Sequence, residues 1–459
     1  MRGDGPAATV APARMAIPTA SGENSVKITG KTAAELFDCV RTLAQSGDLA
    51  PGALLPPARQ LARQLGINRN TVASAYQRLA KAGIAVTQGR LGTAISPSRR
   101  AGEQEGLSTG TALIDLADGN PNPQWLADVT SLIPSQLPRH FLYGDDTILP
   151  ALRQLAHDWL SADCPAGFAV EVTHGAVDAI ERLASAHMVH GDRVAVEEPC
   201  FLGTINALRL AGMQTVGVEI DAWGMQPAAL EAALAKGVRA VLMTPRAHNP
   251  TGCSLSKRRA DALRRILTRF PHVLIIVDDH FALLAETPYY SAIPPSAPRW
   301  ALVRSVSKGL GPDLRVAVVG TDPATAERLR TRLAPGMTWV SHILQSLVAA
   351  CLASPEVRDK LALATREYAR LRNEMRDALQ ANGIALPPAA DGFNVWIPLA
   401  LNEKDVAYAL ARKGWLVRLG NAFEVQGRAQ AIRVTVSKLA EGQAERFARD
   451  LRACLAPPG

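Results

Sequence analysis

Two hydroxyl groups and two cations lie within eleven residues in the segment SVSKGLGPDLR, from Ser305 to Arg315. Lys308 follows an apolar run, and a lysine amine that loses its proton attacks an aldehyde to form a Schiff base. The positive charge of Arg315 nearby would lower the pKa of that amine. Ser305, Ser307 and Arg315 supply hydroxyl and guanidinium groups that hold a phosphate. This pattern predicts a site for a phosphorylated aldehyde, although a surface lysine in a Gly-Pro turn is the simpler alternative.

Other loops carry groups suited to the same ligand. VTHGAVDAIERLA predicts a strand followed by a helix whose first backbone N–H groups can bind a phosphate. VDDH ends an apolar run with Asp278 and Asp279, one of which could pair with a protonated pyridine nitrogen. Asn249, in HNPTG, can donate to a ring oxygen. Phe201, after EEPC, is an aromatic side chain available for ring stacking, although alone it would more often be a core residue.

The segments that position these groups alternate short apolar runs with long helical patterns. RVAVEEP, RAVLMTP, VLIIVDD and WALVRSVS are continuous apolar runs that end in polar loops. Such runs are typical of a mostly parallel sheet that is buried on both faces and binds ligands at the carboxyl ends of its strands. The fold class predicted is therefore an α/β multidomain protein with a second, N-terminal domain of another kind.

The net charge of +8 is confined to the start of the chain. Residues 1–100 hold 13 Lys and Arg against 5 Asp and Glu, whereas residues 101–459 hold 37 of each sign. After Asp48 the next acidic residue is Glu103. A basic small domain joined to a neutral large one indicates an anionic partner, nucleic acid first.

The basic segment predicts three helices followed by a hairpin, which together make a winged helix-turn-helix. TAAELFDCVRTLAQSG, PPARQLARQLG and INRNTVASAYQRLAKAG have helical spacing, and IAVTQGRLGTAI alternates as two strands around a turn. The second helix of a helix-turn-helix enters the major groove with its N-terminus. The residues that could contact DNA are Arg59, Asn68, Arg69, Asn70, Thr71 and, at the tip of the wing, Arg90.

Length and composition set further bounds. A chain of 459 residues exceeds one ordinary core, so two or more domains are expected. The six cysteines are scattered along the chain and form no C-x-x-C motif. This spacing indicates reduced thiols in the cytoplasm and no structural zinc, so we expect no metal site. No apolar run is long enough for a membrane span. We predict a disordered lead-in at 1–24, the winged helix at 25–96, a linker at 97–112 and the large domain at 113–459.

The segment from LPPARQL to LGTAI resembles the winged-helix domain of the GntR regulators. This resemblance implies a double-stranded DNA operator as partner. Pro57 stands where the family usually has Ser, which leaves the start of that helix less defined. Asn68 replaces a serine-type cap, and this exchange is between residues that both cap helices well.

The large domain resembles the fold type I aminotransferases, which use pyridoxal 5′-phosphate. The motifs follow the family's order: Gly-Ala loop, E-x-P-x-aromatic, N-P-T-G, D-D-x, S-x-S-K and an Arg seven residues later. The resemblance implies that Lys308 holds the cofactor as an internal aldimine. It also implies Asp278, with Asp279 still possible, at the pyridine nitrogen, and Asn249 and His280 at the ring oxygen. The groups implied at the phosphate are Gly175, Ala176, Val177, Ser305, Ser307 and Arg315.

Three further residues match family positions. Phe201 would stack on the ring, and Tyr143, in LYGDD, resembles the tyrosine that reaches the phosphate of the neighbouring subunit. Arg433, in IRVTVS, matches the arginine that binds the α-carboxylate of a substrate. Two residues depart from the pattern: His280 stands in place of Tyr, and Phe201 in place of Tyr or Trp. The first departure disfavours efficient transamination.

A GntR-type winged helix followed by an aminotransferase-like domain is the architecture of the MocR regulators, and the motifs are most similar to the PtsJ-type branch. The resemblance implies a cytoplasmic, domain-swapped homodimeric regulator that senses pyridoxal 5′-phosphate, and hence vitamin B6 status, or an amine or amino-acid effector. Two alternatives stay open: an active aminotransferase with an accessory DNA-binding domain, and a DNA-binding protein whose large domain only dimerises. Residual transaminase activity is compatible with the regulator.

Overall fold

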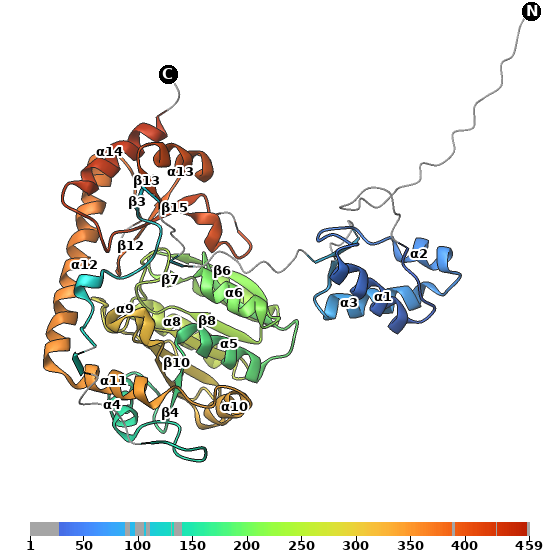
Figure 1. Cartoon of the computed structure of the whole chain (residues 1–459), viewed down its shortest axis with the longest axis horizontal. Helices are drawn as coiled ribbons and strands as arrows, with labels where there is room; N and C mark the ends of the chain where they lie inside the picture. Colours follow the sequence, from blue (N-terminus) through green and yellow to red (C-terminus); the bar gives the residue numbers. More distant parts are fainter. Residues whose placement is uncertain are drawn as a thin grey trace, which may run out of the picture. The chain divides into compact units, whose positions relative to one another are not determined.

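The structure is a computed structural model that describes residues 27–87, 92–96, 105–106, 111–129, 131–132, 140–387, 391–427 and 429–456. The chain divides into two compact units, Met1–Arg100 and Ala101–Gly459, and each is described by itself (Figure 1). The division falls inside the segment predicted as a linker. The predicted lead-in at 1–24 lies outside the described residues.

The described part of the N-terminal unit contains the predicted three helices and two short strands. Thr32 caps the first helix by accepting a hydrogen bond from the Glu35 backbone N–H at 3.2 Å. Gly47 and Gly66 end the first and second helices in the left-handed conformation that glycine adopts without strain. The elements are α1 (Ala33–Ser46), α2 (Ala58–Leu65), α3 (Arg69–Lys81) and the antiparallel pair β1 (Ala85–Thr87) and β2 (Thr93–Ile95).

One face of α3 fills the core of this unit. Val72, Ala75 and Leu79 have no exposed surface, as the helical spacing predicts. Tyr76 lies on the same face and donates its hydroxyl hydrogen to the Pro56 carbonyl at 2.7 Å. The helix begins at Arg69, and its first two residues are exposed. Packing of the buried face therefore fixes the orientation of the residues proposed to contact DNA.

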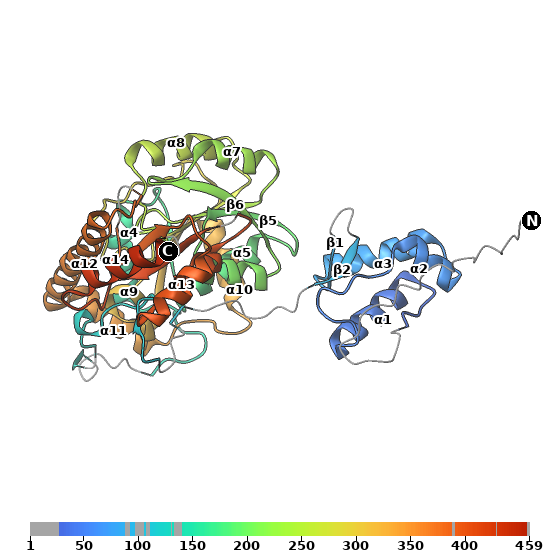
Figure 2. The ribbon, with the colours of Figure 1, turned by 90° about the horizontal axis from the view of Figure 1, so that it is seen from above.

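An eight-stranded sheet forms the centre of the large unit (Figures 1 and 2). The strands from β10 to β6 run parallel to one another, and β4, β11 and β7 are arranged antiparallel to their neighbours. The strand order is β4 (Ala169–Thr173), β11 (Ala317–Thr321), β10 (Trp300–Ser305), β9 (Leu274–Asp278), β8 (Ala240–Met243), β5 (Arg193–Glu198), β6 (Gln214–Asp221) and β7 (Gly224–Met225).

Helices cover both faces of this sheet, which is why its strands are continuous apolar runs. Along β9, Ile275 and Val277 belong to one hydrophobic cluster and Ile276 to the other. The helices of the large unit are α4 (Pro150–Ser161), α5 (Ala176–His187), α6 (Leu202–Leu210), α7 (Pro227–Ala235), α8 (Lys257–Thr268), α9 (Ser307–Leu310), α10 (Pro323–Leu333), α11 (His342–Ala353), α12 (Pro355–Ala381), α13 (Glu403–Arg412) and α14 (Gln443–Leu455).

The C-terminal part of the large unit adds small sheets and packs α13 and α14 together. The long helix α12 runs along one side of the unit (Figure 1). The strands are β12 (Asn394–Pro398), β15 (Ala431–Thr435) and β14 (Arg418–Leu419) in one antiparallel sheet, and β13 (Trp415–Leu416) paired with β3 (Ile114–Asp115). In the described parts of the chain, no helix has the length and apolar character needed to cross a membrane.

Strand register gathers the predicted site residues at one edge of the sheet. Ser305 on β10 lies opposite Ala317 on β11, which lies opposite Thr173 on β4. The loops that leave this row carry Ser307, Arg315 and Gly175, so motifs far apart in the sequence meet at the carboxyl ends of β4 and β10. The edge is the one that a parallel sheet offers to ligands.

Candidate functional site

Lys308 lies just inside α9, in a pocket beyond the carboxyl end of β10. Its Nζ donates to the Gly119 carbonyl at 2.7 Å and is 5.3 Å from the centre of the Phe393 ring. Burial lowers the pKa of Lys308, and the Arg433 charge acts in the same direction, while the Glu105 and Asp118 carboxylates oppose it. A lysine amine with a lowered pKa is the group that condenses with an aldehyde.

The predicted phosphate-binding groups converge at the N-terminus of α5. Gly175 has φ +92°, and a Cβ added there would lie 3.2 Å from Nη2 of Arg315. That guanidinium donates to the His174 carbonyl at 3.3 Å. The Ser305 and Ser307 hydroxyls lie 3.2 Å apart. With the N–H groups of Ala176 and Val177 at the first turn of α5, these donors form an anion site at a helix N-terminus.

Asp278, the last residue of β9, carries a buried carboxylate with an unused oxygen. The residue is 5% exposed, and its Oδ1 has no hydrogen-bond partner among the described residues. Burial, reinforced by the charges of Asp279 and Glu197, raises its pKa to about 7. A buried carboxylate oxygen of this kind is costly unless a donor or cation reaches it.

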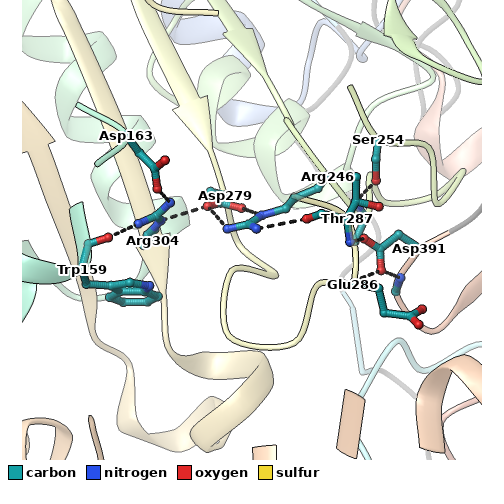
Figure 3. Close-up of polar contacts among 11 residues, drawn as sticks. Trp159, Asp163, Arg246, Ser254, Asp279, Glu286, Thr287, Arg304 and Asp391 are labelled. Atoms are coloured by element: carbon teal, nitrogen blue, oxygen red, sulfur yellow. Dashed lines mark hydrogen bonds and ion pairs between the residues drawn. The ribbon is translucent and has the colours of Figure 1, made fainter. Parts of the chain in front are cut away.

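The adjacent Asp279 differs, because both of its oxygens are occupied (Figure 3). Arg246 binds it through Nε and Nη2, each at 2.8 Å, and the Arg304 Nε donates to it at 2.9 Å. Asp279 has no exposed surface, and Arg304 also pairs with Asp163 (Figure 3). Asp279 is therefore the counterion of two arginines in the core, whereas Asp278 retains an unpaired oxygen.

The two residues predicted at the ring oxygen both line the Lys308 pocket. Asn249 accepts a hydrogen bond from Arg433 at 3.0 Å and donates one to Glu105 Oε1 at 3.1 Å. Burial and the charge of Lys308 lower the pKa of His280 to about 4. A neutral imidazole at this position can still donate one hydrogen bond to a phenolate oxygen.

Two other predicted residues, both aromatic, contact aromatic neighbours. Phe201 packs at the edge of a hydrophobic cluster formed by Leu202, Trp396, Phe423 and Ala431. Tyr143 is 93% exposed and contacts Trp339 edge to face at 5.7 Å. The structure therefore does not bring Tyr143 to Lys308 of the same chain, and its role toward a neighbouring subunit stays a prediction.

Arg433, on β15, is fully buried and makes three polar contacts. Its Nη1 lies 2.5 Å from Glu105 Oε1 and 3.0 Å from Asn249 Oδ1, and its Nη2 donates to the Ala117 carbonyl at 2.7 Å. The arginine therefore lies beside Asn249, which lines the Lys308 pocket, and binds a carboxylate there, while its role toward the α-carboxylate of a substrate stays a prediction. The carboxylate belongs to the chain itself.

Sequence reasoning missed Glu105, Arg246 and a buried pair formed by His248 and Glu197. The His248 Nε2 lies 3.3 Å from Glu197 Oε2; burial alone would lower the pKa of His248, but Glu197 raises it to about 10. Arg246 and His248 lie within three positions of Asn249 in RAHNPTG, so the motif could have indicated that they belong to the site. Glu105 stands in a stretch with no periodicity and gave none. Among the described residues, no group of His, Cys, Asp and Glu is arranged to hold a metal.

The residues predicted to contact DNA lie around the start of α3 and on α2. Asn68 caps α3: its Oδ1 accepts the Asn70 backbone N–H at 2.8 Å, which leaves its amide NH2 as a donor. Arg59, Arg69 and Asn70 are exposed, and Thr71 is half-buried. Arg90 lies outside the described residues. The exposed donors at a helix N-terminus suit phosphates and base edges.

Replacing Arg69 by alanine should weaken DNA binding about tenfold or more, because a phosphate or base contact contributes on the order of 1–3 kcal/mol. The matched control is Arg41→Ala on α1, whose guanidinium pairs with Asp38 at 2.8 Å. Affinity for the DNA upstream of the protein's own gene, measured over a series of salt concentrations, checks this. Equal affinities of the two variants for DNA would show that Arg69, at the start of α3, does not contact DNA.

Two protein-family models match the chain. "Aminotransferase class I and II" matches residues 112–451, and "Bacterial regulatory proteins, gntR family" matches residues 32–95. Each match falls within one of the two structural units.

Similar proteins and structures span most of the chain. The "Vitamin B6 salvage pathway transcriptional repressor PtsJ" of Salmonella typhimurium is 48% identical over 428 residues, 93% of this chain and 99% of that protein. The "Probable rhizopine catabolism regulatory protein MocR" of Rhizobium meliloti is 24% identical over 375 residues, 73% of this chain and 74% of that one. The structure of a multiple substrate aminotransferase from Thermococcus profundus superimposes with a TM-score of 0.69 at 19% identity, over 75% of this chain and 92% of that one, so the two share a fold.

Proposed function

This chain belongs to the MocR-type transcriptional regulators, in which a gntR-family domain precedes an aminotransferase class I and II domain, and we propose that it regulates transcription in response to pyridoxal 5′-phosphate. The observation that carries the proposal is the unpaired, buried Oδ1 of Asp278 in the unit that also presents Lys308. The cofactor's protonated pyridine nitrogen supplies the missing donor.

The residues present fit this cofactor at each of its polar ends. Gly175, Arg315, Ser305 and Ser307 would bind the phosphate, and Asp278 would hold the ring nitrogen. Asn249 and neutral His280, which line the Lys308 pocket, would face the ring oxygen. When bound, pyridoxal 5′-phosphate supplies an aldehyde for an amine and a protonated ring that withdraws electrons. Lys308, with its lowered pKa, is the amine of this chain that would react with that aldehyde.

The DNA-binding half of the proposal is supported by the gntR-family match and by the exposed donors at the start of α3. We propose a double-stranded operator as the partner of this unit, bound by a homodimer in which Tyr143 reaches the site of the second subunit. Similarity to PtsJ over nearly the whole chain favours genes of vitamin B6 metabolism as the targets.

A ligand regulates such a protein by binding more tightly to one arrangement of the dimer than to another. Coupling of about 1–3 kcal/mol between ligand and DNA is typical, which corresponds to roughly 5- to 150-fold in affinity. We propose that the cofactor, or an amine bound with it, shifts the large unit between two such arrangements. Catalytic turnover is not needed for that shift.

Pyridoxal 5′-phosphate is therefore expected to change the affinity of the cofactor-free protein for its upstream DNA by about fivefold or more at fixed salt. Lys308→Ala should abolish the change, and Lys257→Ala, which alters an exposed lysine paired with Asp261, should preserve it. DNA binding titrated with and without the cofactor measures both. An unchanged response in Lys308→Ala would refute the proposal, and transamination of an amino acid with a keto acid would support the enzyme alternative.

A further inference from the structure

Glu105 is the one carboxylate that contacts Arg433 among the described residues. It belongs to the segment that follows the N-terminal unit in the sequence, ten positions after Ile95, the last residue of β2. Its carboxylate lies against the guanidinium of Arg433 at 2.5 Å and accepts from the Asn249 amide at 3.1 Å. The segment is held further by the Gly106 backbone N–H, which donates to the Asp118 carbonyl at 2.9 Å.

Glu105 lies against Gly119, a direct neighbour of Lys308. A Cβ added to Gly119 would lie 2.0 Å from Glu105 Oε1, so the carboxylate fills the space left by that glycine. The carbonyl of the same glycine accepts the hydrogen bond from Lys308. Glu105 Oε2 is buried without a hydrogen-bond partner in the described structure, and the side chain is only 16% exposed.

Arg433 needs an anion because it has no exposed surface. Its other two acceptors, the Ala117 carbonyl and the Asn249 amide oxygen, are neutral. A buried guanidinium without a counterion is strongly unfavourable, and Glu105 supplies the compensating charge. A ligand carboxylate at Arg433 would supply the same charge, but it cannot occupy the position while Glu105 is there.

We propose that Glu105 is an internal ligand that competes with carboxylate-bearing effectors for Arg433 and Asn249, and that an α-amino acid bound at the cofactor releases it. The released residue lies ten positions after the last strand of the DNA-binding unit in the sequence. An effector carboxylate at Arg433 would thereby free the segment around Glu105, which follows the DNA-binding unit in the sequence. The effector part of this inference rests on the proposed function, since it requires the cofactor; the anchoring contact does not.

Hydrogen exchange in the cofactor-free protein tests the anchoring contact alone. The Gly106 amide should exchange about tenfold or more slowly in the wild-type protein than in Glu105→Ala, because the side-chain contacts of Glu105 hold that segment. The control is Glu103→Ala, which removes the same charge two positions earlier in the sequence. Equal exchange of Gly106 in wild-type protein and Glu105→Ala would overturn the proposal, whatever the cofactor does.

The competition is tested on protein loaded with pyridoxal 5′-phosphate, using glycine and methylamine as probes. Both are small primary amines, and only glycine carries a carboxylate. Glu105→Ala should bind glycine at least about tenfold more tightly than the wild-type protein does, with methylamine affinity unchanged, as followed in the cofactor's absorption spectrum. Glycine, but not methylamine, should also remove the exchange protection of Gly106 in the wild-type protein.

An equal gain for both amines in Glu105→Ala, or no gain for glycine, would overturn the competition. Failure of the proposed function would give a different result. The affinity for DNA would then be the same with and without the cofactor, while the Gly106 amide would still be protected by the Glu105 contact. Glu105→Gln provides a second variant: it keeps the size and removes the charge, so it should show a smaller gain for glycine than Glu105→Ala.

Discussion

Asp279→Asn should lower the free energy of unfolding of the C-terminal unit by about 3–5 kcal/mol, although it changes one atom of a side chain far from the surface. Arg246 and Arg304 both depend on this carboxylate for their charge compensation (Figure 3). An asparagine presents one acceptor oxygen and no charge, so two guanidinium groups would remain buried with too little negative charge between them. Asp163 offsets part of the loss at Arg304.

Urea unfolding followed by far-UV circular dichroism measures this effect. The matched control is Asp261→Asn on α8, which pairs with Lys257 at 3.2 Å and Arg264 at 3.3 Å on the surface. That exchange should cost less than about 1 kcal/mol, because exposed ion pairs contribute little. If Asp279→Asn lost cofactor affinity while remaining as stable as Asp261→Asn, Asp279 would be the ring-nitrogen partner and the roles of the two aspartates would be reversed.

The sequence predicted this fold well wherever local rules determine the structure. Gly47, Gly66 and the Asn68 cap mark helix ends, and uninterrupted apolar runs predict strands buried on both faces. The motifs also predicted which loops meet, because the carboxyl ends of parallel strands share an edge. The fold class expected from these patterns is confirmed by the family matches and by the eight-stranded sheet.

Contacts between distant segments could not be predicted in the same way. In the VDDH motif, Asp278 and Asp279 carry the same side chain, so the sequence does not show which one is free to bind a ligand. The structure distinguishes them because Arg246 and Arg304 both bind Asp279. Glu105 and Arg433 are separated by 328 positions, and no motif surrounds Glu105. The role predicted for Tyr143 would need a second subunit, and the single chain shows an exposed ring that contacts Trp339.

Buried polar atoms without hydrogen-bond partners make the site unfavourable for folding when no ligand is bound. Asp278 Oδ1, Glu105 Oε2 and Arg433 Nε all lie buried without hydrogen-bond partners in the described structure. Each such group costs about 1–3 kcal/mol of folding free energy. Binding sites are commonly built at this cost, and substitutions that relieve it stabilise a protein while removing its function.

Asp278→Asn should therefore have opposite effects on cofactor binding and on stability. Loss of the carboxylate that we propose pairs with the pyridine nitrogen should weaken pyridoxal 5′-phosphate binding by about 2–4 kcal/mol, roughly 30- to 1,000-fold in Kd. In the cofactor-free protein the same exchange removes a buried carboxylate whose pKa is raised to about 7. The variant should then be more stable than the wild-type protein at alkaline pH.

The dependence on pH follows from the direction of that shift. In the wild-type protein the folded state keeps a proton on Asp278 up to about pH 7, whereas the unfolded chain loses it near pH 4, so stability falls as pH rises through this window. Asparagine does not titrate. The stability advantage of Asp278→Asn should grow by about 2–3 kcal/mol between pH 5 and pH 8, as measured by urea unfolding without cofactor. A constant difference across that range would show that Asp278 is already ionised in the empty site, where a cation other than the cofactor would have to balance it.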